Sequence, residues 1–90
     1  MSVQDTLAER GKTYGDFATK ARFIQWLKAG FRATPMWPDL LPDQAEALEL
    51  IATKLGRILH GDPYHLDSWH DIAGYAELVT QRIREEDADG

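Results

Sequence analysis

The spacing of apolar residues constrains the fold of this chain more than any other feature of its sequence. Three stretches place apolar side chains every three or four residues, which is the period of an amphipathic α-helix. Strand-like alternation does not persist beyond a few residues, and no internal repeat is present. The sequence therefore predicts an all-α domain.

We expect a small bundle of three main helices with a short N-terminal helix. The expected ranges are 3–10, about 17–31, 42–60 and, starting at residue 66 or 67, to about 85. Gly11 ends the first helix, and Pro35 and Pro38 place residues 32–41 in a loop. Pro42 favours a helix start and Gly61 a helix end. Residues 85–90 are expected to fray.

The 90 residues are too few to divide, so we predict one domain over 1–90 with a modest core. Phe23 and Trp26 lie off the main apolar stripe of their helix, which therefore has two apolar faces. Such a domain often completes its core with a second copy, so we expect a homodimer. The expected core stripes are Phe17, Ala21, Ile24, Leu27, Phe31; Leu48, Ile51, Ala52, Leu55, Ile58, Leu59; and Trp69, Ile72, Ala73, Ala76, Val79, Ile83.

Charge and cysteine content limit the classes of function. The net charge is −5, which disfavours direct nucleic-acid binding because phosphate contacts supply most of that affinity. Six of the ten basic residues fall within residues 1–32, so a smaller phosphate-bearing ligand suits the chain better. No cysteine, signal peptide or membrane-length apolar run is present. We therefore expect a cytoplasmic protein that does not bind a membrane.

Acidic pairs mark two of the predicted helices. Glu46 and Glu49 lie one turn apart in the helix 42–60, and Asp67 and Asp71 one turn apart in the last helix. The side that holds Asp71 also holds a glycine, a tyrosine and a leucine, so it is expected to pack against a helix or line a pocket. Carboxylates on two facing helices can converge on Mg²⁺, which is commonly held by carboxylates together with substrate phosphates. Alternatively, Glu46, Glu49 and Asp67 are helix-start acids or caps.

These residues carry a resemblance. The segments EALE at 46–49 and HDIAGYA at 70–76 resemble the MazG-like, all-α nucleoside triphosphate pyrophosphohydrolases. The segments ERGKTYGDF at 9–17 and WHDIAGYA at 69–76 are similar to small phage and prophage proteins, and this similarity covers nearly the whole chain. The resemblance implies a dimer that uses Mg²⁺, or Mn²⁺, to cleave an NTP or dNTP to the monophosphate and pyrophosphate.

Carried over by position, Glu46, Glu49 and Asp71 match three of the family's four metal-binding acids, which are expected to be catalytic. Ser68 stands at the fourth position, so Asp67 is the nearest replacement. This departure leaves two outcomes, an active enzyme and a nucleotide-binding relative without turnover. The alternative from another class is a non-enzymatic phage accessory module that binds proteins through its helices.

Basic and aromatic residues are candidates for contacts with the nucleotide. Tyr14 is a candidate for stacking on a base, with Arg10 or Lys12 near the phosphates; a plain helix-to-helix corner is the competing interpretation. Lys54 and Arg57 are candidate phosphate ligands, or partners of Asp67 or Asp71 in salt bridges. A zinc site at His60, His65 and His70 is a further hypothesis, but its spacing of five is wrong for one helical face. The dyad at 70–71 resembles that of HD-type phosphohydrolases, which need further His and Asp ligands on a larger helical domain.

Overall fold

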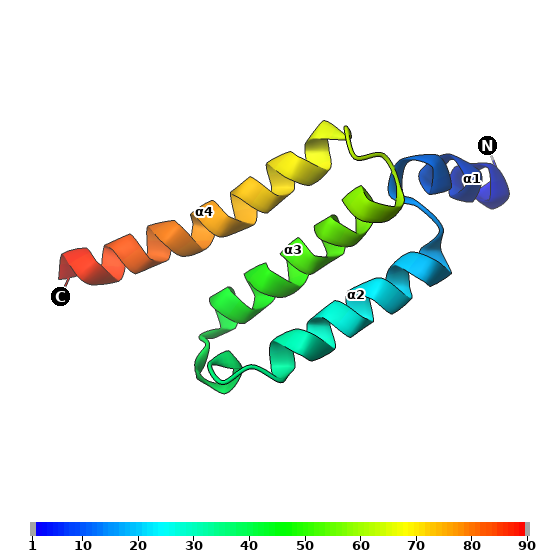
Figure 1. The fold of residues 1–90 in the computed structure, drawn as a ribbon. Helices are drawn as coiled ribbons and strands as arrows, with labels where there is room; N and C mark the ends of the chain where they lie inside the picture. Colours follow the sequence, from blue (N-terminus) through cyan, green and yellow to red (C-terminus); the bar gives the residue numbers. More distant parts are fainter. Residues whose placement is uncertain (1, 90) are drawn as a thin grey trace.

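The computed structural model describes residues 2–89, and every regular element in that range is helical. These elements are α1 (Val3–Tyr14), α2 (Phe17–Arg32), the 3₁₀ turn η1 (Trp37–Asp39), α3 (Pro42–His60) and α4 (Leu66–Asp89) (Figure 1). The predicted all-α class, with three main helices and a shorter one at the N-terminus, is confirmed. No helix in the described range is long and apolar enough to cross a membrane.

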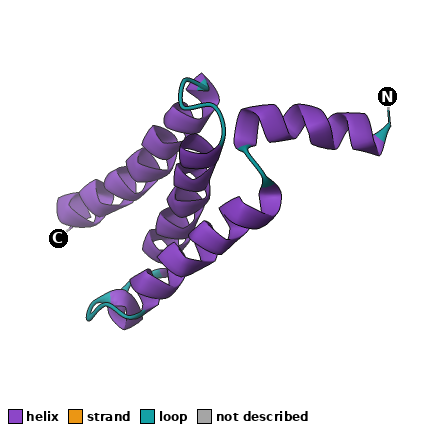
Figure 2. Cartoon of the chain, turned by 45° about the vertical axis from the view of Figure 1, so that its right-hand side comes forward, coloured by secondary structure: helices purple, strands orange, loops and turns teal. Residues whose placement is uncertain are grey.

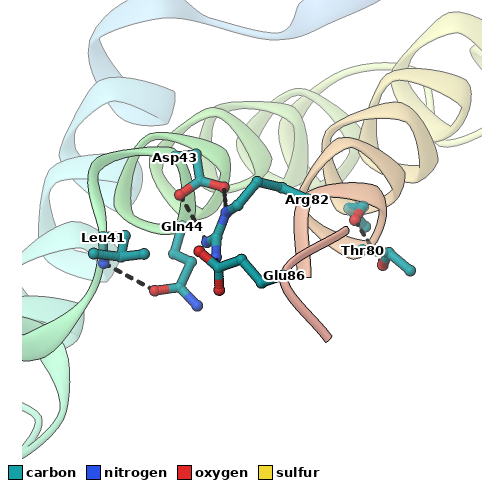
Figure 3. A network of polar contacts seen from close by, with 7 residues as sticks. Leu41, Asp43, Gln44, Thr80, Arg82 and Glu86 are labelled. Carbon is teal, nitrogen blue, oxygen red and sulfur yellow. Dashed lines mark hydrogen bonds and ion pairs between the residues drawn. The ribbon is translucent and has the colours of Figure 1, made fainter. Parts of the chain in front are cut away.

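Helices α2, α3 and α4 run antiparallel in one layer with α3 in the middle, and α1 projects away from it (Figures 1 and 2). The bidentate ion pair of Arg82 with Asp43, at 2.8 Å for both bonds, ties α4 to the start of α3. Glu86 adds a contact of 3.2 Å to the same guanidinium (Figure 3). The layer leaves two broad faces, one on each side of α3.

Side-chain caps fix where the first three long elements begin. The Ser2 hydroxyl accepts the backbone N–H of Asp5 at 3.0 Å, and the Asp16 carboxylate accepts that of Thr19 at 3.0 Å. Gln44 accepts the backbone N–H of Leu41 at 2.9 Å and so caps α3. Each bond satisfies an N–H that the first helical turn leaves without a partner.

Two predicted boundaries are wrong. Helix α1 continues through Gly11 to Tyr14, because one helical glycine costs only about 1 kcal/mol and a positive-φ glycine, Gly15 at +87°, follows immediately. Helix α4 continues past Glu85 to Asp89 where fraying was expected. The pair Arg82–Glu86, one turn apart, supports this extension.

The corner between α1 and α2 packs directly on the loop between α3 and α4. The backbone N–H of Asp62 donates to the carbonyl oxygen of Thr13 at 2.7 Å. A Cβ atom on Gly15 would overlap the His60 carbonyl, and one on Gly61 would overlap the Thr13 carbonyl. Two glycines therefore allow these backbones to touch, which sets the position of α1 relative to α3.

The core of the single chain is thin. Its buried apolar side chains are Ile24, Ala47, Ala52 and Ile58, with Ser68 and Gly56 buried beside them. Several residues expected in the core are largely exposed, and the prediction for them is wrong in the isolated chain. Among the large side chains of this set, the most exposed are Phe17 at 77%, Leu59 at 65% and Trp69 at 52%. One layer of helices has no second layer to cover them.

Candidate functional site: a cationic pocket at Tyr14

A cavity of about 570 Å³ lies between α1, α2 and α3. Its polar wall comes from all three helices and is centred on Tyr14. Its apolar wall is formed mainly by α2, with Phe17, Ala21 and Ile24. The volume falls in the range typical of small-molecule sites, which combine apolar walls with a few polar groups.

Three cations surround the Tyr14 ring. The guanidinium carbons of Arg10 and Arg57 lie 4.9 Å and 4.6 Å from the ring centroid, and the ammonium of Lys20 lies 5.8 Å from it. The edge of the His65 ring also meets Tyr14, at 5.4 Å between centroids. We call the cavity bounded by Arg10, Tyr14, Lys20 and Arg57 the cationic pocket.

The fold places these cations from three separate parts of the chain. Arg10 precedes Tyr14 by four residues and therefore lies on the same side of α1, one turn away. Lys20 belongs to the first turn of α2, just after the corner at Gly15. Arg57 belongs to the last turn of α3, which the contact between the corner and the α3–α4 loop brings against α1.

Among the side chains that the structure describes, residues 2–87, no carboxylate forms an ion pair with any of the three cations. The ion pairs of the described chain use Arg32, Lys54, Arg82 and Arg84 as their basic partners. The Nε atom of Arg57 is buried and has no hydrogen-bond partner. Burial lowers the pKa of the Lys20 ammonium, and the charges of Arg57 and Arg10 lower it further. The pocket thus gathers three cations that have no carboxylate paired with them.

One acid stands at the rim of the pocket. Asp16 contributes to the lining, but its carboxylate already accepts the N–H of Thr19 as the cap of α2. Hydrogen bonds from the backbone and side chain of Thr19 lower the pKa of Asp16. This carboxylate therefore stays ionised and turned toward its helix.

The four predicted metal-binding acids lie apart in the single chain. Glu49 receives a hydrogen bond of 2.7 Å from Arg32 of α2, and Asp71 pairs with Lys54 of α3 at 2.9 Å. The hydrogen bond from Lys54 lowers the pKa of Asp71. Glu46 and Asp67 are exposed. Among the side chains of residues 2–87, no three histidine or acidic side chains come close enough to share a metal ion.

Helix register explains why these acids do not converge. Lys54 of α3 faces Asp71 of α4, and Asp43 faces Arg82. The two helices are therefore antiparallel, with a register that pairs these positions. Glu49 precedes Lys54 by five residues, which displaces it from Asp71 by about 7.5 Å along the helix axis. Glu49 also turns toward α2, whereas Asp71 turns toward α3. A metal ion held by the four acids therefore does not fit this arrangement of one chain.

The mixed face of α4 lines an open depression of about 330 Å³ that includes Asp71, Gly74, Tyr75 and Leu78. The sequence predicted that this face packs against a helix or lines a pocket, and the second alternative describes it. Its floor lacks the ring of cations found at Tyr14, so it is the weaker candidate for an anionic ligand.

The predicted nucleotide contacts divide between the pocket and the surface. Tyr14 and Arg57 line the pocket. Arg10 and Lys12 were alternative phosphate contacts, and only Arg10 lines the pocket. Lys12 is exposed, and Lys54 is occupied by its salt bridge with Asp71. Sequence reasoning missed Lys20 as a residue of the pocket. The only feature that could have pointed to it is its position three residues after Phe17, in the first turn of α2.

The three histidines have separate surroundings. The Nδ1 atom of His60 lies 2.9 Å from the carbonyl oxygen of Gly56, and His65 meets Tyr14 edge-on. His70 borders the depression on α4. This arrangement gives a zinc site no support.

Comparison with protein-family models, with characterised proteins and with solved structures found no match to this chain.

Proposed function

We propose that this protein binds a nucleotide, or a closely related phosphate-bearing small molecule, in the cationic pocket. The observation that carries the proposal is the cluster of Arg10, Lys20 and Arg57 around Tyr14, none of which forms an ion pair with a carboxylate among the side chains of residues 2–87. Like charges this close repel, so a bound polyphosphate would relieve a cost that the free protein bears. It would also give the buried Arg57 Nε–H an acceptor.

Tyr14 has a different role in this proposal from the stacking suggested by its residue type. Two guanidinium groups already lie against its ring, so the ring orients the arginine forks rather than receiving a base. Arginine forks match phosphate oxygens bidentately. The apolar wall at Phe17 and Ala21 is the surface left for a base.

Hydrolysis of the ligand is the finer part of the resemblance to MazG-like enzymes. It would require Mg²⁺ at Glu46, Glu49, Asp67 and Asp71, which do not gather in one chain. The function supported best is therefore that of a nucleotide-binding relative. Pyrophosphate release from the common NTPs and dNTPs in the presence of Mg²⁺ or Mn²⁺ decides the matter. Release that Asp71→Asn abolishes would make the protein an enzyme after all.

Calorimetric titration with inorganic triphosphate, a dNTP panel and the free nucleosides tests the proposed binding. We expect triphosphate-bearing ligands to bind and Arg57→Gln or Lys20→Gln to weaken them about tenfold, since each removes a charged hydrogen-bond donor. Lys12→Gln removes the same charge from exposed surface on α1 and should bind as the wild type does. Equal affinity in all four proteins would overturn the proposal.

A further inference from the structure

The face of the layer opposite the cationic pocket is apolar, and no helix of the described residues packs on it. On α3, Leu55 and Leu59 point away from the side that carries Thr53 and Arg57, because residues two positions apart diverge on a helix. On α2, Trp26 likewise lies opposite Phe17 and Lys28, which line the pocket. We call this surface the apolar face and define it by Trp26, Leu48, Leu55, Leu59, Trp69 and Ile83.

The side chains of the apolar face are strongly exposed for their size. Trp26 is 70% exposed, Leu59 65% and Trp69 52%. On α3 and α4, the residues that continue these stripes from Leu48 to Leu59 and from Trp69 to Ile83 carry no charge, whereas Arg22 precedes Trp26 by one turn at the edge on α2. A contiguous exposed apolar surface of this kind marks an interaction site. The indole N–H of Trp69 already donates to the Pro63 carbonyl at 2.8 Å, so burial of the ring would leave no donor unpaired.

The accessible surface of the chain is larger than that of a compact monomer of the same mass. Its accessible surface is 6572 Å², whereas a folded monomer of 10.2 kDa exposes about 5,300 Å². Its radius of gyration is 15.8 Å, against about 12 Å for a compact domain of this length. The projecting helix α1 accounts for part of the difference. The excess of about 1,250 Å² exceeds the roughly 800 Å² per partner that a standard interface buries.

We propose that a second copy of this chain covers the apolar face, with the two three-helix layers stacked face to face. A two-fold axis brings the same face from each copy together, so the patch has to be complementary to itself. The absence of charge on the α3 and α4 stripes meets that condition in a chain whose net charge of −5 otherwise repels its copy. Trp26 and Trp69 flank the central leucines and supply the aromatic anchors common in such interfaces.

Sedimentation or light scattering of the full chain over a range of protein concentrations tests this dimer. The expected mass is twice the 10.2 kDa of one chain. Leu59→Lys should weaken association at least about tenfold, because the dimer would bury an unpaired ammonium. Since Leu59 is exposed in the single chain, the protomer should keep its helical circular dichroism.

Leu78→Lys is the matched control. Leu78 is 64% exposed, almost the same as Leu59, but it lies on the opposite side of α4 from Trp69. We expect this variant to remain dimeric. A wild type that stays monomeric at all concentrations would mean that another protein covers the face, and the proposal would be wrong. Dissociation by Leu78→Lys but not by Leu59→Lys would overturn it equally.

Discussion

Gly15 sets the angle at which α1 meets the rest of the molecule. Its φ of +87° lies in a region that L side chains rarely adopt, and its Cα faces the backbone of His60. Any side chain at this position therefore meets both backbone strain and steric overlap. The cationic pocket depends on this corner because Arg10 and Tyr14 precede it and Lys20 follows it.

Gly15→Ala should lower the free energy of unfolding by at least about 2 kcal/mol, which lowers the melting temperature by roughly 10 °C in a domain of this size. Thermal unfolding followed by circular dichroism measures it. Gly11→Ala is the control, since nothing lies within 4 Å of a Cβ there and the residue is helical. It should raise stability by about 0.5–1 kcal/mol. Similar losses in both variants would show that the corner is not constrained.

At the level of single residues, the sequence predicted only part of the cationic pocket. Tyr14 and Arg57 carried recognisable residue types and were candidates before the structure was known. Lys20 resembled any exposed lysine in the first turn of a helix. Its role depends on Arg57, 37 positions later in the sequence, and no local pattern relates the two. The pairing of Lys54 with Asp71 was one of two alternatives, and packing of α4 on α3 decided between them.

At the scale of helices, the link between Asp43 and Arg82 joins the first turn of α3 to the far part of α4 (Figure 3). The hydrogen bond from Arg82 lowers the pKa of Asp43 in the folded protein. A carboxyl whose folded pKa is lowered stabilises the fold above its unfolded pKa, and this contribution is lost as the pH falls through the folded value.

Asp43→Asn should therefore reduce stability at neutral pH, and its difference from the wild type should shrink as the pH falls below about 4. Urea unfolding at a series of pH values measures both effects. Asp87→Asn makes the same change on exposed α4 surface and should leave neutral-pH stability close to that of the wild type. A difference for Asp43→Asn that is constant with pH would exclude the ion pair as its cause.

Helix ranges were the most predictable feature of the fold, because proline, glycine and capping residues act locally. The helix predicted from about residue 42 to residue 60 matches α3 at both ends. The faces of the helices were less predictable. A stripe such as Leu48, Leu55 and Leu59 indicates burial, but it does not say whether the covering surface belongs to the same chain. The predicted convergence of Glu49 and Asp71 is not seen in the single chain for a related reason, since it requires a helix register that the sequence does not specify.

At the scale of the whole molecule, the layer separates two chemically opposite surfaces. Arg57 contributes to the cationic pocket on one side of α3, and Leu59 to the apolar face on the other. Stacking two layers through the apolar face would leave both pockets on the outside of the dimer. Each protomer then holds a complete binding site, and association changes stability without changing what the pocket contacts.

This separation predicts that dimerisation and ligand binding can be removed independently. Leu59→Lys should give a monomer that still binds inorganic triphosphate, because Leu59 lies on the face opposite the pocket. We expect an affinity within about twofold of the wild type, a difference in binding free energy of about 0.4 kcal/mol or less. Arg57→Gln should lose most of that affinity and remain dimeric. Titration calorimetry and sedimentation in one buffer, below the melting temperature of the less stable variant, measure both properties. If folded Leu59→Lys monomers no longer bound triphosphate, the binding site would have to include the second copy, and the layer would not separate the two functions.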